Sequence, residues 1–264
     1  MTEDFQFFRF LNGVLELVTE GQTSDVRLEV ADSWLVEDGR ARSLDSHLDR
    51  FGRWVSEISP ACVPSLPDFY VAVKAQIPTQ GRWFPRIEFH AEAQTPNHLY
   101  LRLRPAPEQL GSIILWTLPD ADPRQNPAVK GPDLSLGMQM RRNAKMHGAD
   151  EAVLLSKDGF VLEGALSSLV WWRGDVLCSS SDDLPWLPSI TRDEVFAIAT
   201  QMGYATRTES IKPADLVGLE IWALSSLQGI RPVSDWVGLG GPVGKPDHLD
   251  AFNKRLRMLS TSIH

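Results

Sequence analysis

The side chains best suited to chemistry in this 264-residue chain follow one another in its second half. Lys130 ends a connector rich in proline, aspartate and asparagine, Leu118 to Val129. Glu163 lies inside an otherwise apolar strand pattern, FVLEGALSSLVWW. Ile190-Thr191 then opens a predicted helix, and two hydroxyls, Ser225-Ser226, follow another apolar strand. The order brings together an amine, a carboxylate, a helix start and hydroxyl donors.

These groups are the parts needed to hold pyridoxal phosphate. A lysine amine forms a Schiff base with the cofactor aldehyde. A buried carboxylate such as Glu163 keeps the pyridine nitrogen protonated, so that the ring can accept electrons. A helix N-terminus and the hydroxyls of Ser225 and Ser226 can take the phosphate, and Arg50, in HLDRF, offers a cation for it.

Each group also has an ordinary structural explanation. Most lysines are solvated, and Glu163 could point outward from a strand with one wet face. Thr191 and Glu194 are spaced as a capping box, and the serine pair could simply end a strand. Arg50 could be a surface arginine on its helix. The order and spacing of the groups favour the cofactor hypothesis over separate coincidences.

The elements that must position these residues alternate between strand and helix patterns. Asn12-Gly13 predicts a tight hairpin, and Asp38-Gly39 and Asp158-Gly159 predict two further turns. Apolar periodicity predicts helices over residues 43–58, 68–77, 133–147, 191–202 and 247–259. Strands are expected over residues 5–11, 14–18, 25–36, 86–93, 98–105, 111–118, 151–156, 160–172, 176–180 and 218–226.

This mixed order predicts an α+β fold in two domains. We expect a smaller N-terminal domain at residues 1–118, a connector at 119–129, and a larger cofactor-binding domain at 130–264. Lys130 is expected to open the helical stretch of the second domain. The glycine-rich segment from Gly238 to Pro246 lacks phosphate-loop spacing and predicts a turn before the last helix.

Composition narrows the function classes. The net charge of -8 and a pI near 5.3 argue against nucleic-acid binding. No apolar run approaches the roughly 20 residues that span a bilayer, and no signal peptide pattern opens the chain. Two distant cysteines, Cys62 and Cys178, indicate a reducing compartment. We therefore expect a cytoplasmic protein without membrane or nucleic-acid partners, and the histidines show no metal-ligand spacing.

The chain resembles the class IV aminotransferases, the fold-type IV pyridoxal-phosphate enzymes. The resemblance runs from Lys130 through NAKMHGADEAVLLSKDGFVLEGALSSLVWW, SITRDEVFAIATQMGY and ALSSLQGIRPV, with a weaker match at SLDSHLDRF. It implies a two-domain fold, a homodimer, and a cofactor held between the domains. Branched-chain aminotransferases, D-amino acid aminotransferases and aminodeoxychorismate lyase belong to this family.

The resemblance also implies roles for single residues. Lys130 resembles the Schiff-base lysine and general acid/base, and Glu163 resembles the partner of the pyridine nitrogen. Arg50 resembles the phosphate arginine. Ile190 and Thr191 resemble phosphate donors at a helix start, and Ser226 stands where the family often has a phosphate-binding threonine.

Four departures from the family pattern concern the surroundings of the site. Ser135 stands where many members have a tyrosine near the cofactor, so we group it with the substrate-binding candidates. Ser189 replaces the glycine before Ile-Thr-Arg, and Ser167-Ser168-Leu169-Val170 replaces S-N-L-F. The N-terminal segment is altered to VADSWLVEDG. These changes affect the expected substrate rather than the expected cofactor.

The family resemblance leaves three functions open. The first is transamination between an amino acid and a 2-keto acid. The second is elimination of the aminodeoxychorismate lyase type, releasing pyruvate and 4-aminobenzoate. The third is a non-catalytic member that acts as a binding protein. A substrate carboxylate would need a cation, for which Arg102 and Arg104 in LYLRLRP are candidates, although a solvated strand face explains both.

Overall fold

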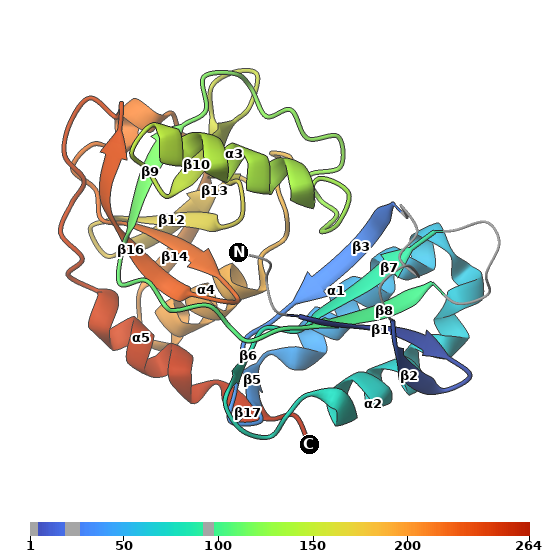
Figure 1. Cartoon of the computed structure of the whole chain (residues 1–264). Coiled ribbons are helices and arrows are strands. Elements are labelled where there is room, and N and C mark those ends of the chain that lie inside the picture. Colours follow the sequence, from blue (N-terminus) through green and yellow to red (C-terminus); the bar gives the residue numbers. More distant parts are fainter. Residues whose placement is uncertain (1–4, 19–26, 92–97) are drawn as a thin grey trace. The chain divides into compact units, whose positions relative to one another are not determined.

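The computed structural model describes residues 5–18, 27–91 and 98–264 (Figure 1). The chain divides into two compact units. Unit 1 comprises residues 1–108, 129–132 and 259–264, and unit 2 comprises residues 109–128 and 133–258. Both units combine sheets with helices, which agrees with the predicted α+β class.

Unit 1 contains two sheets. The first has the strand order β2-β1-β8-β7-β3, with all pairs antiparallel. The second is a small sheet with the order β17-β5-β4-β6. The strands are β1 (Gln6–Leu11), β2 (Val14–Leu17), β3 (Leu28–Ser33), β4 (Val36–Glu37), β5 (Arg40–Arg42), β6 (Arg82–Trp83), β7 (Arg86–His90), β8 (Leu99–Leu103) and β17 (Ser260–Ser262).

Two helices, α1 (Leu44–Ile58) and α2 (Leu66–Gln76), share the apolar core of unit 1 with its strands, and a short 3₁₀ helix, η1 (Pro60–Ser65), joins them. Phe51, Val55 and Phe69 are fully buried there. The predicted hairpin is confirmed, because Asn12 and Gly13 have φ values of 50° and 85° between β1 and β2. Those positive values suit asparagine and glycine.

Unit 2 is built on one mixed sheet with the order β11-β10-β9-β16-β15-β12-β13-β14. Pairs β9–β10, β9–β16 and β13–β14 are parallel and the others are antiparallel. The strands are β9 (Ile113–Thr117), β10 (Glu151–Leu155), β11 (Val161–Gly164), β12 (Ser168–Arg173), β13 (Val176–Ser180), β14 (Ala205–Glu209), β15 (Ile221–Ser225) and β16 (Gly229–Val237).

Helices cover this sheet in two places (Figure 1). Helix α3 (Leu134–Met146) packs on β9, β10 and β11 through Met140 and Ala144. Helices α4 (Ile190–Gln201) and α5 (Leu249–Met258) pack against β12, β13, β15 and β16, with η2 (Pro213–Leu216) between β14 and β15. A separate apolar cluster that includes Trp171 and Trp236 fills the sheet's other face. The loop from Gly238 to Pro246 leads into α5, as predicted.

The observed units differ from the expected domain limits in two respects. Strand β9 lies within the predicted N-terminal domain, yet it pairs with β10 and β16 in the sheet of unit 2. Lys130 does not open a helix, because α3 begins at Leu134, and Val129–Pro132 groups with unit 1. Parallel pairing over long sequence separations leaves no local signal, so periodicity alone does not assign β9 to the sheet of unit 2.

Candidate functional site

Glu163 is buried, with 4% of its surface exposed, on strand β11. Its oxygen Oε1 accepts two hydrogen bonds of 2.8 Å each, from Nη1 of Arg124 and from the backbone N–H of Leu187. Among the described residues, none donates to Oε2. The alternative of an outward, solvated glutamate is therefore wrong, since this carboxylate sits in a dry environment with one oxygen fully engaged.

Arg124 is a site residue that the sequence interpretation missed. Its side chain is 8% exposed and ends a short network that starts in the connector. Asp122 accepts hydrogen bonds from Nε and Nη2 of Arg124, and Oδ1 of Asp122 also accepts from the Arg124 backbone N–H. The backbone N–H of Asp122 donates to Leu155 O at the end of β10. The signal was present as an arginine that follows Asp120 and Asp122 in the connector, six residues before Lys130.

Charge in this buried cluster does not balance. Two carboxylates, Asp122 and Glu163, share the single guanidinium of Arg124. Burial raises the pKa of Glu163 above its ordinary value, while Arg124 opposes that rise and Asp122 adds to it. For Arg124, burial favours the neutral form, but Glu163 and Asp122 outweigh it and raise its pKa. The cluster therefore has room for one more positive charge.

The N-terminus of α4 lies beside this carboxylate. Ser189 is the N-cap, because its side chain accepts a hydrogen bond of 3.2 Å from the Arg192 backbone N–H. The predicted capping by Thr191 is wrong: Thr191 is inside the first turn and 2% exposed. Since Leu187 binds Glu163 and Ser189 caps the helix, the structure brings Glu163 and the Ile190-Thr191 helix start together.

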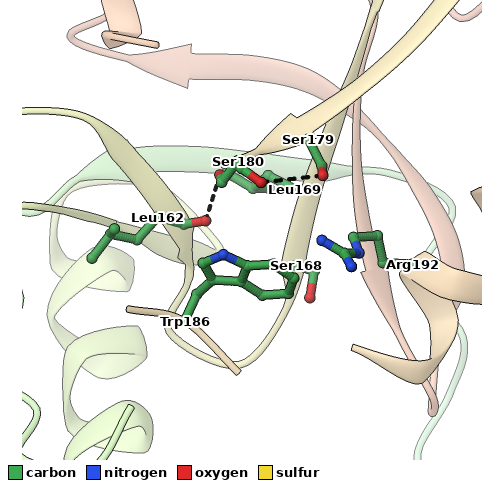
Figure 2. Close-up of a pocket in the computed structure, with 7 residues that line it drawn as sticks. All are labelled: Leu162, Ser168, Leu169, Ser179, Ser180, Trp186 and Arg192. Atoms are coloured by element: carbon green, nitrogen blue, oxygen red, sulfur yellow. Dashed lines mark hydrogen bonds between the residues drawn. The ribbon is translucent and has the colours of Figure 1, made fainter. Parts of the chain in front are cut away.

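Arg192 holds the segment that precedes α4. Its guanidinium binds Asp182 at 3.0 Å and lies 4.2 Å from the centre of the Trp186 ring. The indole N–H of Trp186 in turn donates to Ser181 O at 2.9 Å. Figure 2 shows a small pocket beside this segment. It is lined by Leu162, Ser168, Leu169, Ser179, Ser180, Trp186 and Arg192.

Ser225 and Ser226 occupy the turn between β15 and β16. Ser225 ends β15 and its hydroxyl accepts a hydrogen bond of 3.1 Å from the Gln228 backbone N–H. This contact gives Ser225 a structural role in closing the turn. Both serines are half-buried, and their phosphate role stays a prediction.

In unit 1, Arg50 is not a surface arginine. It is 7% exposed on α1, and its Nε and Nη2 donate to the two carboxylate oxygens of Asp32 at 2.8 and 2.9 Å. His47 Nδ1 lies 2.7 Å from Asp32 Oδ1. Burial alone would raise the pKa of Asp32, but Arg50 and His47 hold it well below its ordinary value. This buried cluster fixes the direction of the Arg50 guanidinium.

Replacing Arg50 tests the strength of this cluster. Arg50→Ala should lower the free energy of unfolding by about 3–5 kcal/mol, because it leaves a fully buried Asp32 carboxylate without its main cation. Urea unfolding of the cofactor-free chain measures this loss. Arg53→Ala, an exposed arginine on the same helix, is the control and should cost less than about 1 kcal/mol. An Arg50→Ala loss as small as the control's would show that His47 and the Ser33 backbone N–H satisfy Asp32 without Arg50.

The main chain of Lys130 is fixed to unit 1. The backbone N–H of Ala31, on β3, donates to Lys130 O at 2.6 Å. The next residue, Gly131, has a φ of 155°, and a Cβ there would lie 2.6 Å from Glu29 O. Glycine is therefore required for the segment to run against β3. The Lys130 side chain is half-buried. Lys130 and Glu163 belong to different units, so their facing one another stays a prediction.

The two candidate arginines for substrate binding lie at and just after β8. Arg102 donates from Nε to Glu88 Oε1 at 2.9 Å, and its guanidinium is 4.1 Å from the Phe5 ring centre. Arg104 lies 4.9 Å from the ring centre of Phe84. The solvated-face explanation is wrong for Arg102, since its partner Glu88 is 1% exposed. Binding of a substrate carboxylate stays a prediction, as does any contact of Ser135, which is exposed on α3.

Glu88 predicts how the stability of unit 1 depends on pH. Burial would raise its pKa, but hydrogen bonding to His90 and the charges of Arg86 and Arg102 lower it to about 2 from 4.5. Because the pKa of Glu88 is lower in the folded than in the unfolded chain, its carboxylate stabilises the fold above pH 4.5. That stabilisation is lost as the pH falls from about 4.5 to 2. The loss should be on the order of 3 kcal/mol. Urea unfolding between pH 7 and 2.5 should show it, and Glu88→Gln should flatten that acid limb. An unchanged limb in Glu88→Gln would contradict the assignment.

The sequence was compared with models of known protein families. The family model described as amino-transferase class IV matches residues 29–236, well over half of the chain. The chain belongs to the class IV aminotransferases. The family predicted from the Lys130, Glu163 and Ile-Thr-Arg motifs is therefore confirmed.

Two curated relatives of this class IV aminotransferase differ in how much they match. A bifunctional aminodeoxychorismate lyase / D-amino acid transaminase from Mycobacterium tuberculosis is 26% identical over 229 residues, covering 75% of this chain and 78% of the relative. A branched-chain-amino-acid aminotransferase from Escherichia coli is 33% identical over 114 residues, covering 39% of this chain and 35% of the relative.

Solved structures show the same fold. A hypothetical aminotransferase from M. tuberculosis in a PLP-bound form superposes with a TM-score of 0.81, at 21% identity, over 97% of this chain and 98% of that one. A putative 4-amino-4-deoxychorismate lyase from Legionella pneumophila superposes with a TM-score of 0.71, at 16% identity, over 92% and 98%. These superpositions confirm the predicted fold.

The described part of this class IV aminotransferase gives two further results. No helix within it is long and apolar enough to cross a membrane. Across residues 5–18, 27–91 and 98–264, no cluster of histidine, cysteine, aspartate and glutamate side chains could hold a metal ion.

Proposed function

We propose that this chain binds pyridoxal phosphate and catalyses transamination between an amino acid and a 2-keto acid, with Lys130 as the residue that holds the cofactor covalently. The observation that carries the proposal is Glu163. It is buried, its Oε1 is engaged, and its cluster with Asp122 and Arg124 lacks one positive charge. A protonated ring nitrogen would supply both the missing cation and a donor for Oε2.

The remaining residues fit the phosphate. Ile190 and Thr191 stand in the first turn of α4, where backbone N–H groups attract anions. Ser226 would add a hydroxyl, and Ser225 supports the turn that presents it. Arg50 would supply a cation whose orientation Asp32 already fixes. When bound, pyridoxal phosphate supplies a ring that accepts the electron pair released at the substrate α-carbon.

This chain's own groups would carry the proton. The amine of Lys130 is proposed to remove and return the substrate α-proton, a role that suits an amine freed from its covalent link. Glu163 would keep a proton on the ring nitrogen. Arg102 and Arg104 remain the proposed cations for the substrate carboxylate, and Ser135 a proposed substrate contact. A homodimer in the cytoplasm is the expected state of the enzyme.

Elimination of the aminodeoxychorismate lyase type is the second candidate. The M. tuberculosis relative whose name carries both activities aligns over 78% of its own length. Both reactions begin with loss of the same proton, so Lys130 and Glu163 serve either one.

Incubation with pyridoxal phosphate tests the proposal. A visible absorbance band that borohydride bleaches, present in the wild type and absent in Lys130→Ala, is the expected result. A panel of amino acids with 2-keto acids, and aminodeoxychorismate, then separates the reactions. Conversion of the cofactor to its amine form indicates transamination, and pyruvate release without conversion indicates elimination. A wild type without the band would overturn the proposal in favour of the non-catalytic alternative.

A further inference from the structure

We propose that Arg124 is a positioning residue that orients the Glu163 carboxyl, places a cation beside its Oε1 and leaves Oε2 for the cofactor. This inference rests on the proposed function, and it assigns a role to a residue of the connector. It deepens that function by naming what sets the protonation of the carboxylate partner. The contacts that carry it all lie within unit 2.

The Arg124 guanidinium is held in one orientation by several hydrogen bonds. Three side-chain hydrogen bonds of 2.8–3.0 Å join its Nε and Nη2 to Asp122. Asp122 is itself tied to the end of β10 through Leu155 O. One edge of the guanidinium is therefore occupied, and Nη1 is left to point at Glu163. A planar fork held on one side has little freedom to release its other contact.

The hydrogen bonds to Glu163 divide its two oxygens. Arg124 and Leu187 both bind Oε1, so the carboxylate cannot rotate without losing two contacts in a dry environment. Oε2 receives no hydrogen bond from the described residues. Arg124 thus determines which oxygen remains for a ligand, and Leu187 fixes the same oxygen from the segment before α4.

The charges act in the same direction. Burial disfavours the charged form of Glu163, and Asp122 repels it further. Arg124 is the one cation that opposes both among the charged groups found to act on Glu163. Without Arg124 the pKa of Glu163 would be higher, so the carboxyl would stay protonated over a wider pH range. A neutral carboxyl does not stabilise a protonated ring nitrogen as a carboxylate does.

A merely structural role for Arg124 makes a different prediction. If it only anchors the connector, its loss should lower stability and leave the titration of Glu163 unchanged. The two roles are separated by following the Glu163 carboxyl carbon by ¹³C NMR in the full chain, with and without pyridoxal phosphate. The Glu163→Gln variant identifies the signal.

The expected result is a shift in titration. In Arg124→Gln the pKa of Glu163 should rise by about one to three pH units, and in Arg124→Lys by less, because the cation is kept. Turnover of Arg124→Gln should fall as the pH drops through the raised pKa and recover on the alkaline side. Arg173→Gln, which breaks the arginine pair with Glu209 in the same unit, is the control and should leave Glu163 unshifted.

Two results would contradict the proposed role of Arg124. An unshifted Glu163 in Arg124→Gln, or an equal shift in Arg173→Gln, would overturn the assignment. If Arg124→Gln does not fold, Arg124→Lys is the second test, because it keeps a cation but loses the fork that Asp122 holds. The pKa of Glu163 should still rise in that variant, and an unshifted Glu163 would likewise overturn the assignment. A wild type that binds no pyridoxal phosphate would defeat the proposed function alone, because the titration of Glu163 would still report on Arg124.

Discussion

Lys130→Ala should lose turnover by at least about 10²–10⁴-fold, the contribution of a positioned acid/base group, and loss of the covalent link adds to this. The fold should persist, because the lysine backbone contact to Ala31 does not need the side chain. Steady-state assays of the transamination half-reaction, with borohydride trapping and peptide mapping, measure both consequences. The trapped cofactor should be found on the peptide that contains residue 130.

The matched control for this experiment is Lys157→Ala. Lys157 is exposed on the turn between β10 and β11, in the other unit from Lys130. It should retain wild-type turnover and trapping. An active Lys130→Ala enzyme, or cofactor trapped on another lysine, would refute the assignment of the covalent site.

Glu163→Gln should lower turnover by about 10²–10³-fold, the usual cost of losing one buried electrostatic group at a reacting centre. The amide has the shape of the carboxylate and can still accept from Leu187, so the unfolding transition should change little. The absorbance of the bound cofactor should also shift with pH differently from that of the wild type, because the ring nitrogen loses its anionic partner.

Glu209→Gln is the control for the carboxylate. Glu209 also binds an arginine, Arg173, at 2.7 Å and an indole N–H from Trp171, but it has no proposed part in the cofactor site. Its replacement should leave turnover within twofold of the wild type, on the order of an ordinary surface change. Equal losses in the two variants would mean that Glu163 matters only for folding.

The turns and helices could be predicted because each depends on residues that are close together in the sequence. Turn chemistry at Asn12-Gly13, and apolar periodicity in α1, α4 and α5, depend on neighbouring residues. The allocation of β9 could not be predicted in this way. Its partners β10 and β16 lie far along the chain, and its apolar residues suit either domain.

The same division between local and distant information explains the site. Glu163 could be recognised as an acid in an apolar strand, and Ile190-Thr191 as a helix start. Arg124 was missed because Glu163, to which it donates, lies 39 residues further along the chain, and because the connector shows no periodicity. Ser189 looked like a loss relative to the family glycine, yet its hydroxyl caps α4. Burial of Arg124, which residue spacing does not show, decides the first case, and the local hydrogen bond from the Arg192 backbone N–H decides the second.

Unit 1 consists of three separate segments of the chain, residues 1–108, 129–132 and 259–264, and unit 2 consists of the two segments between them. Neither half could therefore be produced as an autonomous fragment by cutting at a single bond. Strand β17 (Ser260–Ser262) pairs with β5 (Arg40–Arg42), so the last strand of the chain completes a sheet of unit 1.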